Sequence, residues 1–153
     1  MLTDYCNQYY EPQAERYNVL AANGNSRAKA IAAWKQKVLN EWDNIRVVSC
    51  QQPDASYIVS KHDPIHGEVV LDLGRLKPED IGVEMLFATT DKKGALHIQE
   101  TVQYDVAEYK DGVARYTMTI EPDRTGMYQV GIRMYAKNPV LPHRQDFPLV
   151  KWL

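Results

Sequence analysis

The sequence lacks two features that would point to particular classes of partner. No apolar run approaches the roughly 20 residues of a membrane span, and no signal peptide precedes the start. The 153 residues carry a formal net charge of −2, so no basic excess is present to bind a phosphate backbone. The sequence therefore predicts a globular chain whose partner is neither a membrane nor a nucleic acid.

Cysteine and the common catalytic motifs are also scarce. Cys6 and Cys50 lie far apart and predict two reduced thiols in a cytoplasmic protein rather than a disulfide. There is no Gly-rich phosphate loop, nucleophile elbow or paired-cysteine metal motif. His62 and His66 flank a carboxylate, but Pro64 between them predicts a loop with no third ligand, so we expect no metal site.

The composition changes after Ile45, which divides the chain into a helical segment, 1–45, and a β domain, 46–153. In the first part we expect two or three helices. Pro12 predicts a break near Glu11, and Asn23-Gly24 predicts the end of the helix that begins near Pro12. The three expected helices are 1–10, 12–22 and 27–44.

The last of these helices has an apolar stripe at helical spacing. Its residues are Ile31, Trp34, Val38, Trp42 and Ile45. A stripe of this kind usually faces a core. The alternative is that Trp34 or Trp42 stacks on a sugar.

Seven short alternating segments without intervening helices predict an immunoglobulin-like antiparallel β-sandwich. Asp111-Gly112 is the strongest signal for a tight hairpin. The seven expected strands are 46–51, 68–73, 82–87, 96–104, 113–120, 126–135 and 147–152.

The approach to the sixth strand suggests a tyrosine corner. Tyr128 follows Gly126 by two residues after a turn that begins at Glu121. Immunoglobulin-like domains use this arrangement to bury a tyrosine whose hydroxyl binds upstream backbone. The alternative is an ordinary strand with one buried tyrosine.

The polar side chains offer no fixed catalytic pair. His97, Glu100, Asp105 and Glu108 follow a predicted strand, where alternate residues point oppositely, so a solvated sheet face is expected. Arg144 lies in a proline-bounded polar loop. It can reach a carboxylate on another domain, or it can be held by its own neighbour Asp146.

Several segments resemble bacterial α-glucan phosphorylases of the glycogen and maltodextrin type. The tail, from Gly131-Ile132-Arg133-Met134-Tyr135 to Val150-Lys151-Trp152-Leu153, resembles their extreme C-terminus. The start, with Tyr5, Tyr9-Tyr10 and Pro12, resembles the segment where their catalytic body ends. A strand-turn-strand pattern over 70–84 resembles their β domain, so the resemblance covers most of the chain.

The resemblance implies an accessory domain of a larger enzyme. Catalysis in that family belongs to a two-lobed glycosyltransferase body of several hundred residues, where a lysine holds pyridoxal phosphate. None of the family's catalytic motifs maps onto this sequence, so no catalytic, cofactor or metal residue is expected here. Met1 can then be an internal methionine of the longer enzyme.

Two functions from different classes remain open. The first is a structural module that contacts the catalytic body of the same polypeptide or self-associates. The second is a sandwich that binds α-glucan through exposed aromatics such as Tyr57, Tyr109 or Trp152, which a row of them on one sheet face would favour. The residues expected at an interdomain contact are Leu2, Tyr5, Tyr9, Tyr10, Tyr17 and Arg144.

Overall fold

The computed structural model describes residues 11–51, 56–141 and 143–153; the side chains of 11–25 and Ser56 lie outside this description. Over these residues the chain is mainly β, with one α-helix at its N-terminal side. It divides into two compact units, Met1–Asn40 and Glu41–Leu153. The predicted helix 1–10, with Leu2, Tyr5, Tyr9 and Tyr10, lies outside the described residues, as does the side chain of Tyr17.

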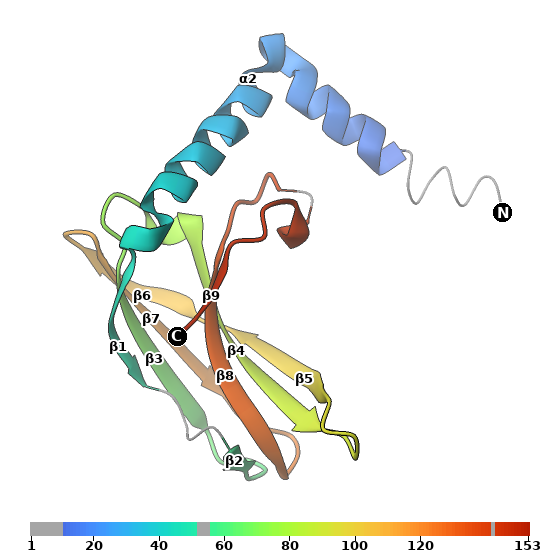
Figure 1. The fold of residues 1–153 in the computed structure, drawn as a ribbon, viewed down its shortest axis with the longest axis vertical. Helices are drawn as coiled ribbons and strands as arrows, with labels where there is room; N and C mark the ends of the chain where they lie inside the picture. Colours follow the sequence, from blue (N-terminus) through green and yellow to red (C-terminus); the bar gives the residue numbers. More distant parts are fainter. Residues whose placement is uncertain (1–10, 52–55, 142) are drawn as a thin grey trace, which may run out of the picture. The chain divides into compact units, whose positions relative to one another are not determined.

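The helix α2 spans Glu11–Glu41 without interruption and is followed by the short 3-10 helix η2, Trp42–Asn44. The predicted end at Asn23-Gly24 is therefore wrong, and two expected helices are one. A glycine inside a helix costs only about 1 kcal/mol relative to alanine, and the alanine-rich segments on both sides favour helix strongly. Figure 1 shows that α2 bends part-way along its length instead.

The predicted apolar stripe of this segment is buried at its C-terminal end. Val38, Trp42 and Ile45 are buried, whereas Ile31 and Trp34 are half-exposed. A core role is therefore confirmed for Val38, Trp42 and Ile45.

Nine strands are described, and all of them pair antiparallel in two sheets. A four-stranded sheet has the order β1-β3-β7-β6, and a five-stranded sheet has the order β2-β8-β4-β5, with β9 also paired to β8 (Figure 1). The strand bounds are β1 Arg46–Gln51, β2 Ser56–Val59, β3 Ile65–Asp72, β4 Ile81–Thr90, β5 Leu96–Gln103, β6 Asp105–Lys110, β7 Val113–Ile120, β8 Gly126–Ala136 and β9 Val150–Trp152.

All seven predicted strands are present, but the predicted count is too low because β2 and β6 were missed. Both are sheet edges, and β6 is exposed along its whole length. An edge strand needs no apolar face, so it gives a weak periodic signal. The hairpin signal at Asp111-Gly112 could have revealed β6, because a tight hairpin requires a strand on each side.

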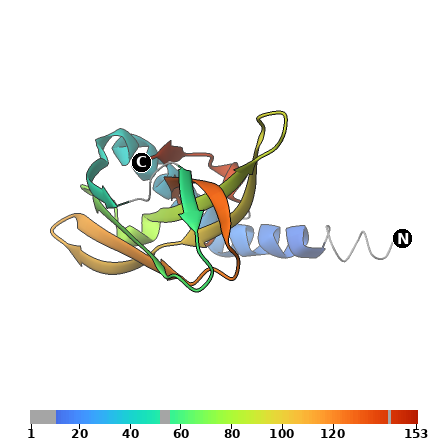
Figure 2. The same cartoon turned by 90° about the horizontal axis from the view of Figure 1, so that it is seen from below.

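The hairpin at Asp111-Gly112 is confirmed. Lys110 pairs with Val113, and the two residues between them have φ values of 50° and 84°. Two positive φ values in a two-residue loop define the turn whose twist matches antiparallel strands. Figure 2 shows this β6–β7 hairpin and the β4–β5 hairpin on opposite sides of the view.

The core lies on the inward faces of both sheets. In β3 the buried positions alternate with more exposed ones, and Val69 and Leu71 have no solvent exposure. In the five-stranded sheet Val83, Met85 and Ile132 are equally inaccessible. The central strand β4 is buried on its other face as well, and that second face carries the candidate site.

Candidate functional site

The candidate site is built on the outer face of the five-stranded sheet, the face of β4 that carries Gly82, Glu84, Leu86 and Ala88. Side chains alternate along a strand, so these residues point away from the core-facing Val83 and Met85. The register places Arg133 of β8 and Gln103 of β5 directly opposite Glu84. Directly opposite residues in antiparallel strands share one face, which brings the three side chains together.

Glu84 is a charged residue with no solvent exposure, and it is held by three donors. Its Oε1 accepts from Nε of Arg133 at 2.6 Å and from Nη1 of Arg144 at 2.7 Å. Its Oε2 accepts from Nε2 of Gln103 at 2.5 Å. A buried carboxylate is tolerated only when paired and hydrogen-bonded in this way.

An aromatic ring completes this arrangement. The Tyr135 hydroxyl donates to Oε1 of Gln103 at 2.7 Å, and the guanidinium carbon of Arg144 lies 4.0 Å from the Tyr135 ring centroid. The ring covers Gly82, where any Cβ would collide with it. We call Glu84, Gln103, Arg133, Tyr135 and Arg144 the Glu84 cluster.

The electrostatics of the cluster fix Glu84 in its ionised form. Burial by itself raises the pKa of the carboxyl group, but the hydrogen bonds from Arg144, Arg133 and Gln103 outweigh burial and lower the pKa below its ordinary value. A general acid or base needs a pKa near the working pH and a free path to substrate. Glu84 has neither, so its carboxylate is not placed to transfer a proton.

The cluster attaches the β8–β9 connection to the sheet. Arg144 begins the 3-10 helix η4, Arg144–Asp146, in that connection. Asp146 Oδ2 accepts from the backbone N–H of His143 at 3.1 Å, which fixes the start of η4. Arg144 thus contacts the carboxylate of Glu84 in its own domain, 60 residues earlier, which the sequence did not predict. The contact of Arg144 with another domain stays a prediction.

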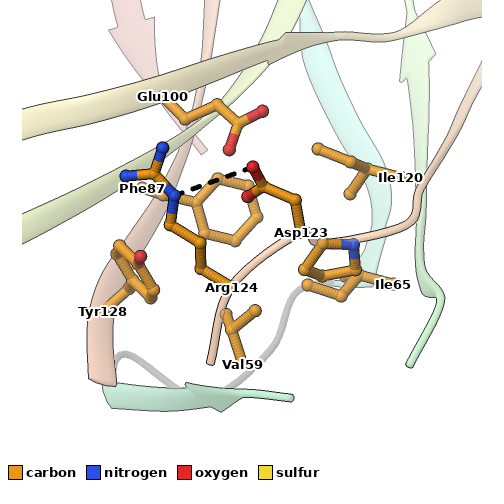
Figure 3. A pocket seen from close by; sticks show the side chains of 9 residues that line it. Val59, Ile65, Phe87, Glu100, Ile120, Asp123, Arg124 and Tyr128 are labelled. Carbon is orange, nitrogen blue, oxygen red and sulfur yellow. Dashed lines mark ion pairs between the residues drawn. The ribbon is translucent and has the colours of Figure 1, made fainter. Parts of the chain in front are cut away.

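A second group of polar residues lines a hollow at the end of the inward faces (Figure 3). Glu100 and Asp123 point toward one another there, and Arg124 Nε lies 3.6 Å from Asp123 Oδ2. This hollow has a volume of about 20 Å³, which is room for one water molecule, and Glu100 and Asp123 also line an adjoining depression of about 510 Å³. Its lining residues are Val59, Ile65, Phe87, Glu100, Ile120, Pro122, Asp123, Arg124 and Tyr128.

Tyr128 lies at this hollow and is half-exposed, so the prediction of a buried tyrosine is wrong. Its ring meets Phe87 edge-on, with the centroids 6.1 Å apart, and leans over Gly126. No hydrogen bond of its hydroxyl is found within the described part of the chain. Tyr128 is not fully buried because it lies near the start of β8, where its hydroxyl can reach water.

The histidines singled out in the sequence lie in separate local contacts. His62, in a turn with φ 63°, has Nδ1 2.9 Å from Glu121 Oε1, and His66 has Nδ1 2.9 Å from Thr119 Oγ1. His97 contacts Asp91 at 3.1 Å. Over residues 11–51, 56–141 and 143–153, no three His, Cys, Asp or Glu side chains are grouped to hold a metal ion.

The three exposed aromatics proposed for glucan binding do not share a sheet face. Tyr109 is on β6 of the four-stranded sheet, and its hydroxyl donates to the Leu76 carbonyl at 3.3 Å. Tyr57 pairs with the core-facing Tyr128, whereas Trp152 pairs with the outward-facing Arg133. The row that would favour a glucan-binding sheet is therefore not formed.

Glu84, Gln103 and Tyr135 are not recognisable as a site from the sequence, because the partners of Glu84 are far away in the sequence. The sequence does contain one signal that points to Glu84. Glu84 is the only charge between Ile81 and Ala88, in a run that is otherwise apolar or glycine. A single charge inside a fully buried strand must be paired, which predicts a basic partner on a neighbouring strand.

Comparisons with known proteins agree with this architecture. The family model described as "Glycogen phosphorylase C-terminal domain" matches residues 42–153. The maltodextrin phosphorylase of Thermococcus litoralis is 22% identical over 157 residues, which cover 99% of this chain but only 18% of that protein. No solved structure matches the chain. None of the described helices is both long and apolar enough to cross a membrane. Because the family model covers most of its length, the chain belongs to the glycogen phosphorylase C-terminal domain family.

Proposed function

We propose that this chain is a non-catalytic accessory domain of an α-glucan phosphorylase and that it contacts the catalytic part of that enzyme. The observation that carries the proposal is the family match together with the share of the relative that it covers. The chain spans 18% of the length of maltodextrin phosphorylase, so the larger part of that protein lies outside the matched region.

The geometry of the ionisable groups supports an accessory role. Glu84 is ionised and held by two arginines, which leaves it no capacity for proton transfer. The pyridoxal phosphate that the resemblance implies then belongs to the catalytic part, and we expect no saturable absorbance change when it is added to this chain.

We also infer that the two sheets form an immunoglobulin-like sandwich in the cytoplasm. Both sheets are antiparallel, and their inward residues Leu71 and Met85 are fully buried. Cys50 is a free, half-buried thiol, which suits a reducing compartment. Nuclear Overhauser contacts between inward methyl groups of the two sheets would be expected, and a spectrum without them would contradict the sandwich.

One observation favours the alternative of glucan binding. The indole of Trp152 lies over Gly131, with Cζ3 only 3.0 Å from the place of a Cβ, and the side chain is 60% exposed. An aromatic ring with one supported and one open face can stack on a sugar ring. Titration with maltoheptaose tests this, because a fluorescence change that is lost in Trp152→Leu would favour the alternative function.

The accessory role is tested by adding the chain to the rest of its phosphorylase, produced as a separate polypeptide. We expect the two to form a complex in analytical ultracentrifugation, and glucose 1-phosphate release from maltodextrin to require only the larger polypeptide. Failure to form a complex would contradict the proposed contact. Phosphorolysis by the 153-residue chain alone would contradict the non-catalytic role.

A further inference from the structure

Large apolar side chains gather on the outer face of the five-stranded sheet, the face that carries the Glu84 cluster. Each side chain in this set is at least 42% exposed, and the set comes from four strands. Scattered exposed apolar residues are normal, but several on one sheet face mark an interaction surface. The set is Ile58, Leu96, Ile98, Met127, Val150 and Trp152.

The strand register places these side chains on one face. Leu96 and Ile98 of β5 lie opposite Thr90 and Ala88 of β4, and Met127 of β8 lies opposite Ile58 of β2. Between them β4 contributes Leu86, which is 3% exposed and lies opposite Gly131, where the Trp152 ring rests.

The surface also has a place for a partner side chain. A depression of about 210 Å³ beside Met127 is lined by Ala88, Thr89, Thr90, Met127, Tyr128 and Gln129. The combination of tryptophan, methionine and arginine on one patch matches the residue types enriched at protein interfaces. Trp152 and the two arginines of the Glu84 cluster are the types that most often dominate binding energy.

The net charge of the Glu84 cluster indicates what kind of partner binds this face. Within the Glu84 cluster two guanidinium groups share one carboxylate oxygen, which leaves one excess positive charge. The side chain of Arg133 is 23% exposed and that of Arg144 is 40% exposed, so both have donors at the surface. A partner with a carboxylate at this point would balance the charge.

The strands of the same face do not supply that carboxylate from a second copy of this chain. Among the described strand residues of the outer face, Glu84 is the only acid, and its oxygens are already occupied. Two such faces brought together would add excess positive charge without a counter-charge. This favours a different partner surface, one that is apolar and carries an acid.

We propose that the outer face of the five-stranded sheet binds the catalytic part of the phosphorylase. In this contact apolar side chains of that part cover Ile98 and Trp152, and an acidic side chain pairs with Arg144. The inference rests on the proposed accessory function, and it assigns the contact to this face of the domain. The share of the relative outside the matched region supplies a body large enough to cover it.

The test measures the dissociation constant between the 153-residue chain and the rest of its phosphorylase by isothermal titration calorimetry. The test variants are Ile98→Gln, Trp152→Leu and Arg144→Gln. The matched control is Val48→Gln, because Val48 is also on a strand and is 60% exposed, but it lies on β1 of the other sheet. Thermal melting of each variant alone verifies that it folds.

We expect each test variant to raise the dissociation constant at least tenfold and the control to leave it within about twofold. Lower salt should strengthen binding of the original chain but not of Arg144→Gln. If the chain binds the larger polypeptide and all variants bind equally, the assignment to this face is wrong while the accessory function stands. If no binding occurs, the accessory function itself fails. If the chain forms dimers that Ile98→Gln dissociates, the face is a contact between copies and the proposal is overturned.

Discussion

Replacing Glu84 by glutamine should destabilise the domain more than any surface substitution would. The new amide has the same shape as the carboxyl group but carries no charge. Whichever way it turns, its NH₂ group faces donors, either the guanidinium groups on the Oε1 side or the Gln103 amide on the Oε2 side. Both arginines then lose the carboxylate with which they pair in the cluster.

The size of the expected loss in unfolding free energy follows from how deeply the ion pairs of Glu84 are buried. Removing one partner of a buried ion pair costs about 3–5 kcal/mol when the remaining charge stays buried. Here Arg133 and Arg144 are 23% and 40% exposed, so water can partly solvate them after the change. We therefore expect Glu84→Gln to lower the free energy of unfolding by about 2–3 kcal/mol at pH 7, measured by urea denaturation.

The dependence on pH gives a second, independent readout. The folded pKa of Glu84 is lowered, so its contribution is present above the unfolded pKa of about 4.3 and is lost as the pH falls through the folded pKa. The difference in unfolding free energy between the original chain and Glu84→Gln should thus be full at pH 7 and shrink below about pH 4.

The matched control is Glu108→Gln. Glu108 also pairs with an arginine, Arg115, but at 3.5 Å and with both side chains at least half exposed. Such surface pairs contribute about 0–1 kcal/mol. A Glu84→Gln cost no larger than that of Glu108→Gln, or a cost that is the same at pH 7 and pH 3, would refute the account of the cluster.

Four further substitutions have definite expected outcomes. Gly112→Ala should lower the free energy of unfolding, measured by urea denaturation, more than Gly94→Ala does. Both glycines have φ 84°, but only at Gly112 would a Cβ lie 3.1 Å from a backbone oxygen. Equal losses of stability would contradict this. Each of these two glycine substitutions should lower the free energy of unfolding by about 1–2 kcal/mol, because alanine is strained in the left-handed backbone conformation. Tyr116→Phe should leave stability unchanged or raise it by about 1 kcal/mol, because the buried Tyr116 hydroxyl has no hydrogen-bond partner in the described part of the chain. A clear loss would mean that this hydroxyl has a partner. Tyr128→Phe should change the melting midpoint by less than 1 °C, since the residue is half-exposed. A large drop would instead support the predicted tyrosine corner.

Some features were determined by local sequence. Asp111-Gly112 specifies its hairpin because few residue pairs adopt two positive φ values without strain. The period-two alternation of β7 and β8 specifies strands for the same local reason, since one face must be apolar. Family-specific segments in the tail predicted a phosphorylase C-terminal domain, which the family model confirms.

The helix and the edge strands were decided by wider context. Asn23-Gly24 is a local stop signal, yet α2 continues, because about thirty residues of helix-favouring sequence outweigh one glycine. Strands β2 and β6 exist because β8 and β7 present unpaired backbone groups beside them.

Only the tertiary structure brought together the Glu84 cluster. Glu84, Gln103, Arg133 and Arg144 come from three strands and a loop, separated by up to 60 residues. By sequence alone, Gln103, Arg133 and Arg144 are ordinary polar residues of a solvated face. Glu84, in its apolar run, indicates a basic partner but not which one. The register of β4 with β5 and β8 makes them neighbours, and the β8–β9 connection closes over them and removes Glu84 from water. Burial and long-range pairing depend on how distant strands align, and a pattern within one segment carries no information about that alignment.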